Sequence, residues 1–218
     1  MKILSIWCVL GVLFILFVVC GKQDIYESFS SNTKIVLLGD SIFQNELFVP
    51  QKKSVGALLK AQYGSKKVKI YAEDGAMIND MKTQLLILDK KYNKKNTHIF
   101  LSFGGNDIIE NFIEFYTGVT LKQMFKDYKN NISKLQSQFP NANIHLSTIY
   151  YPKKEPYTYY HDTIKSWNDM IISYAKKMGF SVLRIDKYFK KKKDFTQSIE
   201  PSINGSKIIL NRIKENLN

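Results

Sequence analysis

Three residues that suit acyl transfer each follow an apolar run of the sequence. Ser41 lies just beyond the run 34–39, Gly75 follows the run 68–72, and Asn106 follows the run 97–105. A serine hydroxyl can attack an ester carbonyl when a base takes its proton, and backbone or amide N–H groups can stabilise the oxyanion that forms. Each residue alone could serve only a turn or a helix cap, since Gly, Ser and Asn are common in both. Their recurrence in one chain favours a serine hydrolase site.

Five short apolar runs that alternate with helical patterns predict an α/β domain. The runs are residues 34–39, 68–72, 97–105, 143–150 and 181–186. The first, third and fourth are nearly apolar throughout, as in strands that are covered on both faces. This alternation predicts about five parallel strands with helices on both faces of the sheet. Ligands bind beyond the carboxyl ends of such strands, and the three residues fall at that end.

The segments between the apolar runs have helical periodicity. Helices are expected within residues 54–64, 78–92, 121–139, 160–179 and 205–216. Ser54 can cap the first of them, and Gly64 can end it. Ser202 or Asn204 can cap the last helix, which closes the chain.

The motifs at the strand ends resemble those of the SGNH, or GDSL-type, hydrolase superfamily. The sequence has Gly39-Asp40-Ser41, then Gly75, then Gly104-Gly105-Asn106-Asp107, in the family's order across residues 34–218. The stretches 39–50, 73–81, 102–108 and 199–208 resemble one bacterial subgroup. The resemblance implies a three-layer, flavodoxin-like fold and a serine esterase ancestry. It also implies that Ser41 is the nucleophile, that Gly75 and Asn106 complete the oxyanion hole, and that no metal or organic cofactor takes part.

The residue that would take the proton from Ser41 departs from the family pattern. The last family block is Asp-x-x-His, whereas this chain has Gln197 and Glu200 at the two positions. An ordinary glutamate is a weak base at neutral pH, because its pKa is about 4.3, but burial can raise that value toward 6 or 7. Glu200 is therefore the expected base, with Asp194 as an assisting acid. Pro201 favours an extended conformation at Glu200, and we expect the carboxyl group to lie within reach of Ser41.

The three histidines are weaker candidates for this base. His98 falls at the start of a predicted strand, at the end of the sheet remote from Ser41, and His145 falls inside another strand. His161 follows the tyrosine-rich stretch 150–160 at the appropriate end of the sheet, so it could reach the site. The tyrosines of that stretch are expected to pack the loop, although aromatic side chains at a pocket mouth would suit a sugar or acyl group.

The first residues do not belong to the predicted domain. Residues 3–20 form an apolar run without charge, just long enough to span a bilayer as a helix. We expect residues 1–21 to be a membrane anchor, with a cleaved signal and secretion as the alternative, and residues 22–33 to be a tether. The charges that flank the run favour a domain on the non-cytoplasmic side.

The chain is strongly basic, with 32 Lys and Arg against 19 Asp and Glu and a net charge of +13. The lysines are scattered, and no nucleic-acid motif accompanies them, so we interpret them as solvated surface charge and expect no nucleic-acid partner. A basic, tethered nucleic-acid binder remains the weakest hypothesis. Both cysteines, Cys8 and Cys20, precede the domain, which excludes a disulfide framework and a Cys/His metal site within it.

These observations predict a membrane-anchored or secreted ester hydrolase. Its substrate would be an acetylated sugar, a lipid or another small ester. The alternative is a binding module that keeps the fold and the oxyanion hole, holds a glycan or acyl ligand and lacks a competent base, because Glu200 replaces the usual histidine.

Overall fold

The computed structural model describes residues 32–111 and 121–217 of the 218-residue chain. The residues from Lys34 onward form one compact unit. No helix within the described ranges is both long and apolar enough to cross a bilayer. The expected anchor over residues 1–21, and most of the tether, lie outside the described residues.

A five-stranded parallel sheet forms the centre of the domain, in the order β2-β1-β3-β4-β5. The strands are β1 (Lys34–Gly39), β2 (Val68–Ile70), β3 (Thr97–Ser102), β4 (Asn143–Ser147) and β5 (Ser181–Leu183). This is the flavodoxin-like order, in which the chain changes direction across the sheet between β1 and β3. The expected three-layer α/β fold with five parallel strands is confirmed.

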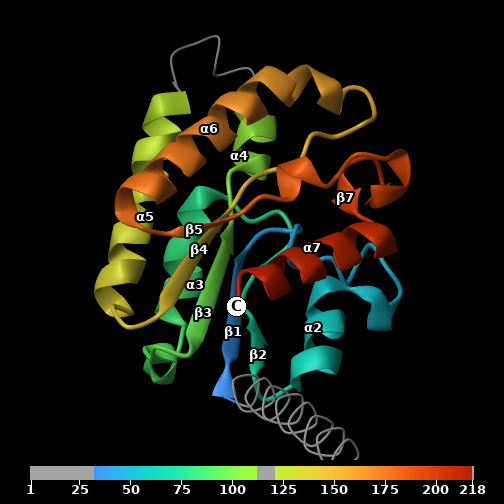
Figure 1. Ribbon diagram of the computed structural model, residues 1–218. Helices are drawn as coiled ribbons and strands as arrows, with labels where there is room; N and C mark the ends of the chain where they lie inside the picture. Colours follow the sequence, from blue (N-terminus) through green and yellow to red (C-terminus); the bar gives the residue numbers. More distant parts are fainter. Residues whose placement is uncertain (1–31, 112–120, 218) are drawn as a thin grey trace, which may run out of the picture. The chain divides into compact units, whose positions relative to one another are not determined.

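Helices cover both faces of this sheet (Figure 1). Helices α2 (Val55–Tyr63) and α7 (Ile203–Glu215) pack together on one face. Helices α3 (Met81–Leu86), α5 (Leu121–Gln138) and α6 (His161–Met178) lie on the other face, where α5 contacts both of its neighbours. The short helix α4 (Gly105–Glu110) follows β3 and contacts α6. Apolar strand residues, among them Ile35 to Leu38 and Ile99 to Leu101, are fully buried between the two layers.

The helix caps agree closely with the sequence. The Ser54 side chain accepts a hydrogen bond from the backbone of Ala57 at the start of α2, and the helix ends at Gly64. At the start of α7 the Ser202 side chain accepts from the backbone N–H groups of Asn204 and Gly205, so Ser202, rather than Asn204, is the cap.

The single helix expected over residues 78–92 is wrong. That stretch forms a 3-10 turn at Ile78–Asp80, then α3, then a second 3-10 turn at Lys90–Tyr92. The Asp89 side chain accepts a hydrogen bond from the backbone of Lys91 and starts the second turn, because Asp competes for local backbone groups. Leu88 and Tyr92, on either side of the break, are both buried.

A two-stranded antiparallel hairpin follows the sheet and precedes α7. Strands β6 (Phe195–Thr196) and β7 (Glu200–Pro201) pair through Thr196 and Glu200. Gln197 and Ser198 form its turn with positive φ values of 43° and 77°. The sequence analysis did not foresee this hairpin, which sets the position of Glu200.

Candidate active site

The turn after β1 presents Ser41 through a glycine that cannot be replaced without a clash. Gly39 has a φ of +140°, and a Cβ atom there would lie 2.2 Å from the carbonyl oxygen of Ser102 in β3. The side-chain amide of Gln84 holds the same residue, accepting from the Gly39 N–H and donating to its carbonyl, each at 2.8 Å. Strand β1 is thereby fixed immediately before Ser41, which is 7% exposed.

Asp40 lies inside this turn and is almost fully buried. One of its carboxylate oxygens, Oδ1, accepts hydrogen bonds from the backbone N–H of Ile42 and from the hydroxyl of Ser102. Burial raises the pKa of Asp40 to about 7, and the charges of Glu200 and Asp107 act in the same direction, although its hydrogen bonds oppose the shift. Asp40 therefore holds the turn beside Ser41 through these hydrogen bonds.

Asn106 and the glycine loop after β2 are joined by a hydrogen bond. The Asn106 side chain donates to the carbonyl of Ala76 at 3.0 Å, which leaves its second amide hydrogen for another acceptor. Gly75, next to Ala76, has a φ of +74°, and a Cβ there would meet no atom within 4 Å. The structure thus brings Asn106 and the Gly75 loop together. Asn106 lines the same cavity as Ser41, whereas Gly75 is not among the residues that line it.

Glu200 lines the same cavity as Ser41. It is 8% exposed, and its carboxyl group is near enough to the Ser41 hydroxyl for the two to interact. Burial raises the pKa of Glu200 to about 7, the interaction with Ser41 opposes that shift, and the charge of Asp74 adds to it. The other carboxyl oxygen, Oε2, has no hydrogen-bond partner among the described residues.

Two side chains hold the backbone on either side of Glu200. The Tyr150 hydroxyl donates to the carbonyl of Ile199 at 2.7 Å. The Asn45 amide donates to the carbonyl of Pro201 at 3.1 Å and to the Ser206 hydroxyl at 2.7 Å, and its oxygen accepts from the Val55 N–H. Asn45 is fully buried and belongs to the segment that follows Ser41. It therefore couples the serine turn to the glutamate segment.

Asp194 lies elsewhere in the same loop and has other partners. Its carboxylate accepts from the backbone N–H groups of Lys190 and Lys191 and from the Asn204 side chain. It does not line the cavity that contains Ser41. Gln197, at the position of the family's aspartate, is exposed in the hairpin turn. The structure therefore does not bring Asp194 or Gln197 to Ser41 beside Glu200.

The histidines are engaged in other contacts. A ring nitrogen of His161 lies 2.7 Å from the carbonyl oxygen of Pro152, and its ring packs edge-on against Tyr151. His98 and His145 lie 3.0 Å apart through their ring nitrogens, and His145 stacks on Phe100 within the sheet. None of the three lines the cavity beside Ser41.

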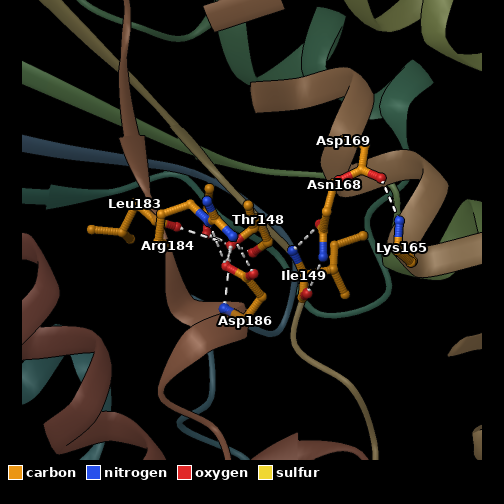
Figure 2. Close-up of polar contacts among 9 residues, drawn as sticks. Thr148, Ile149, Lys165, Asn168, Asp169, Leu183, Arg184 and Asp186 are labelled. Atoms are coloured by element: carbon orange, nitrogen blue, oxygen red, sulfur yellow. Dashed lines mark hydrogen bonds and ion pairs between the residues drawn. The ribbon is translucent and has the colours of Figure 1, made fainter. Parts of the chain in front are cut away.

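The loop after β4 is held by a second amide clamp (Figure 2). The Asn168 side chain accepts from the Ile149 N–H and donates to the Ile149 carbonyl, each at 2.7 Å. Beside it, the Thr148 hydroxyl donates to Asp186, whose carboxylate also pairs with Arg184. These contacts fix the chain just before Tyr150, which enters the cavity.

Sequence reasoning missed the buried amides Asn45, Gln84 and Asn168. The last two lie on the apolar faces of amphipathic helices, beside Met81 and Leu85 in α3 and beside Trp167 in α6. A polar residue in such a position needs a buried partner, and that was the available signal.

The cavity beside Ser41 is small, with a volume of about 40 Å³. Its polar lining includes Asp40, Ser41, Asn106 and Glu200. Most of the remaining wall is apolar and includes the isoleucines 42, 108, 109, 149, 164 and 199. A serine that shares a largely apolar cavity with a buried carboxyl group and an amide donor has the parts needed for acyl transfer.

One family of known proteins matches most of this domain. The model of the GDSL-like lipase/acylhydrolase family matches residues 37–202. No curated protein sequence shows significant similarity to the chain.

Solved structures show the same fold at low sequence identity. A member of the lipolytic G-D-S-L family from Veillonella parvula is 17% identical, with a TM-score of 0.62 over 84% of this chain and 97% of the other. Phospholipase A1 from Streptomyces albidoflavus is 15% identical, with a TM-score of 0.62 over 84% and 99% of the two chains. Esterase EstA from Pseudoalteromonas is 19% identical, with a TM-score of 0.61 over 84% and 95%.

Proposed function

The chain belongs to the GDSL-like lipase/acylhydrolase family, and from this premise we propose that it hydrolyses esters with Ser41 as nucleophile and Glu200 as base. The observation that carries the proposal is that Ser41 and the buried carboxyl group of Glu200 line one cavity and interact there, with the pKa of Glu200 raised to about 7 by burial. A base with a pKa near the working pH is well matched to proton transfer.

The proposed reaction begins when Ser41 Oγ attacks the ester carbonyl and Glu200 takes the hydroxyl proton. The tetrahedral oxyanion accepts hydrogen bonds from the Asn106 amide and from the N–H groups of Ser41 and Gly75. Glu200 then gives its proton to the leaving alkoxide, and an acyl-serine remains. In the second half a water molecule attacks the acyl-serine while Glu200 takes a proton from that water. The carboxylic acid then leaves as Glu200 returns the proton to Ser41.

Asp194 has a different place in this proposal. Its carboxylate is occupied by backbone and side-chain donors of its own loop. We assign it to holding the segment that precedes the β6–β7 hairpin. Glu200 then acts without a second carboxylate to orient it, and the bonds from Tyr150 and Asn45 to its neighbours take over that role.

For the cellular location we propose membrane anchoring through residues 1–21, with the domain on the non-cytoplasmic side. The support is the uncharged apolar run 3–20 and its flanking charges. Fractionation of cells that produce the full chain tests this. Recovery of the whole chain in the membrane fraction, with the domain open to added protease, is expected. A shortened soluble product outside the cell would instead favour a cleaved signal.

A fluorophosphonate probe tests the proposed nucleophile, because it reacts with an activated serine. Wild-type chain should be labelled at Ser41, and Ser41→Ala should lose both the label and at least about 10³-fold in ester hydrolysis. Ser137→Ala, which alters an exposed serine on α5, should match wild type. A folded wild-type protein that stays unlabelled and binds an ester without cleaving it would support the binding-module alternative. Nothing in the cavity or in the comparisons favours that alternative at present.

A further inference from the structure

The cavity beside Ser41 has room for a short chain only. A cavity needs about 10–15 Å³ to hold one water molecule, so a cavity of about 40 Å³ is small beside a chain of eight carbons. The deep walls include Ile108, Ile149 and Ile164, each of which is at most 5% exposed. The half-buried Tyr157 and Tyr160 of the loop before α6 also line the cavity. Buried side chains at interior packing density yield little space to an additional methylene group.

The reaction geometry decides which half of an ester enters this cavity. The leaving oxygen must receive its proton from Glu200 and then depart with the alcohol, so the alcohol needs an open route. The acyl chain stays attached to Ser41 during the second half of the reaction and is apolar. It therefore belongs among the isoleucines that line the cavity.

We propose that the chain is specific for esters of short acyl groups, of two to four carbons, held in the cavity formed by Ile108, Ile109, Ile149 and Ile164 beside Ser41. This inference rests on the proposed function of the same site. The fold alone does not give this specificity, since one solved structure with a similar fold is named as a phospholipase A1. Of the three substrate classes that the sequence left open, it selects acetylated sugars and other small esters over long-chain lipids.

Chain-length selectivity is measured on the full-length protein with para-nitrophenyl esters of two, four, eight and twelve carbons. The expected kcat/KM is highest for the two shortest esters, and at least about tenfold lower for the eight-carbon ester. Equal or higher kcat/KM for the long esters would overturn the inference. A second series keeps the acetyl group and varies the alcohol. If kcat/KM falls more steeply with alcohol size than with acyl size, the cavity holds the alcohol and the inference is wrong.

Variants at Ile109 move the selectivity in both directions. Ile109 lines the cavity from α4 and is only half-buried, so its replacement should leave the protein folded. Ile109→Ala should raise the eight-carbon to two-carbon ratio of kcat/KM by about tenfold, and Ile109→Phe should restrict activity to the acetyl ester. Ile208→Ala, a matched change of a half-buried isoleucine on α7 outside the cavity, should leave the ratio unchanged. An unchanged ratio in both Ile109 variants contradicts the inference.

A turnover-independent measurement separates this inference from the proposed function. Methyl and octyl fluorophosphonates carry their alkyl group where the acyl chain would lie, and their rates of labelling Ser41 do not depend on deacylation. Faster labelling by the methyl compound supports the short cavity. Equal labelling refutes the short cavity but leaves Ser41 established as the nucleophile. Absence of labelling by either compound removes both the inference and the proposed function.

Discussion

Buried titratable side chains gather at two places along the central strands, and the two clusters differ in what they can do. Beyond the carboxyl ends of β1 and β3 lie Asp40 and Glu200, beside Ser41. Nearer the amino ends of β3 and β4 lie His98 and His145, whose ring nitrogens are 3.0 Å apart. Both clusters have strongly shifted pKa values, so a shifted pKa alone does not identify an active site.

The difference is in what surrounds the polar atoms that remain open. His145 contacts His98 through one ring nitrogen and stacks on Phe100 at a ring-centroid distance of 4.3 Å, and its other ring nitrogen, Nδ1, is buried without a hydrogen-bond partner among the described residues. Glu200 Oε2 also lacks a partner among them, but Glu200 lines a cavity together with Ser41. A nucleophile, an open acceptor and space for a substrate distinguish the carboxyl end.

The stability that each cluster contributes also depends on pH, and the two dependences have opposite signs. Burial raises the pKa of Glu200 from 4.5 to about 7, so the stability linked to its protonated form is complete below pH 4.5 and is lost as the pH rises through 7. Burial and the neighbouring His98 lower the pKa of His145 from 6.5 to about 3. The stability linked to neutral His145 is complete above pH 6.5 and is lost as the pH falls toward 3.

The largest expected effect at the carboxyl end comes from Glu200→Gln. The substitution keeps the size of the side chain and removes its ability to accept a proton from Ser41. We expect kcat/KM for a short ester to fall by about 10²–10⁴-fold, the range for loss of a general base. Glu110→Gln, an exposed glutamate on α4, is the control and should retain full activity. Activity of Glu200→Gln within threefold of wild type would show that another group takes the proton.

Asn106→Ala should have the next largest effect. Loss of one oxyanion donor costs about 10²–10³-fold in kcat, and the KM for a short ester should change little, because the ground-state carbonyl depends less on that donor. The variant also loses the bond to Ala76, so circular dichroism should accompany the kinetics. A change confined to KM would mean that Asn106 binds substrate rather than the oxyanion.

The pH dependence of kcat/KM should follow Glu200. Activity is expected to fall about tenfold per pH unit below a midpoint near 7, because only the ionised carboxylate accepts the proton. The charge of Asp74 contributes to raising the pKa of Glu200, so Asp74→Asn should shift the midpoint to lower pH. Asp169→Asn, in an exposed ion pair on α6, should not shift it. A midpoint that is unmoved in Asp74→Asn would argue against Glu200 as the titrating group.

The sequence predicts the nucleophile side of this site better than the base side. Strand β1 was predicted with its observed bounds, since four apolar residues run into Gly39, whose backbone must approach Ser102. Asn106 likewise follows a strand with a strong apolar signal. These residues are placed by regular elements next to them in sequence, and such elements have a clear pattern.

The geometry around Glu200 depends on long-range contacts that have no local pattern. Strands β6 and β7 have two residues each, too short for alternation to be visible. The bonds that hold them come from Asn45 and Tyr150, which are 156 and 49 residues from their partners. The helix expected within residues 78–92 is shortened for a local reason instead, because the Asp89 side chain bonds the backbone of Lys91 and starts a separate turn.

A smaller effect is expected on stability, where Glu200→Gln should stabilise the protein. At pH 8 the wild-type carboxylate is charged and buried, whereas Gln is neutral, so the free energy of unfolding should rise by on the order of 2 kcal/mol. At pH 4 the gain should vanish, because the wild-type group is then protonated in both states. Urea unfolding at the two pH values measures the difference. An equal change at both values would assign the effect to packing instead of charge.

The smallest effect on activity is expected from His145→Phe, at the other end of the strands. His145 contacts His98 and Phe100 and does not line the cavity beside Ser41, so kcat/KM at pH 8 should stay within about twofold of wild type. Phe keeps the stacking on Phe100 and removes the group whose protonation opposes folding. The loss of stability between pH 6.5 and 4, measured by urea unfolding, should therefore be smaller than in wild type. A more than tenfold loss of activity in a folded variant would mean that the two clusters are coupled through β3 and β4, and that the functional separation of the two ends is wrong.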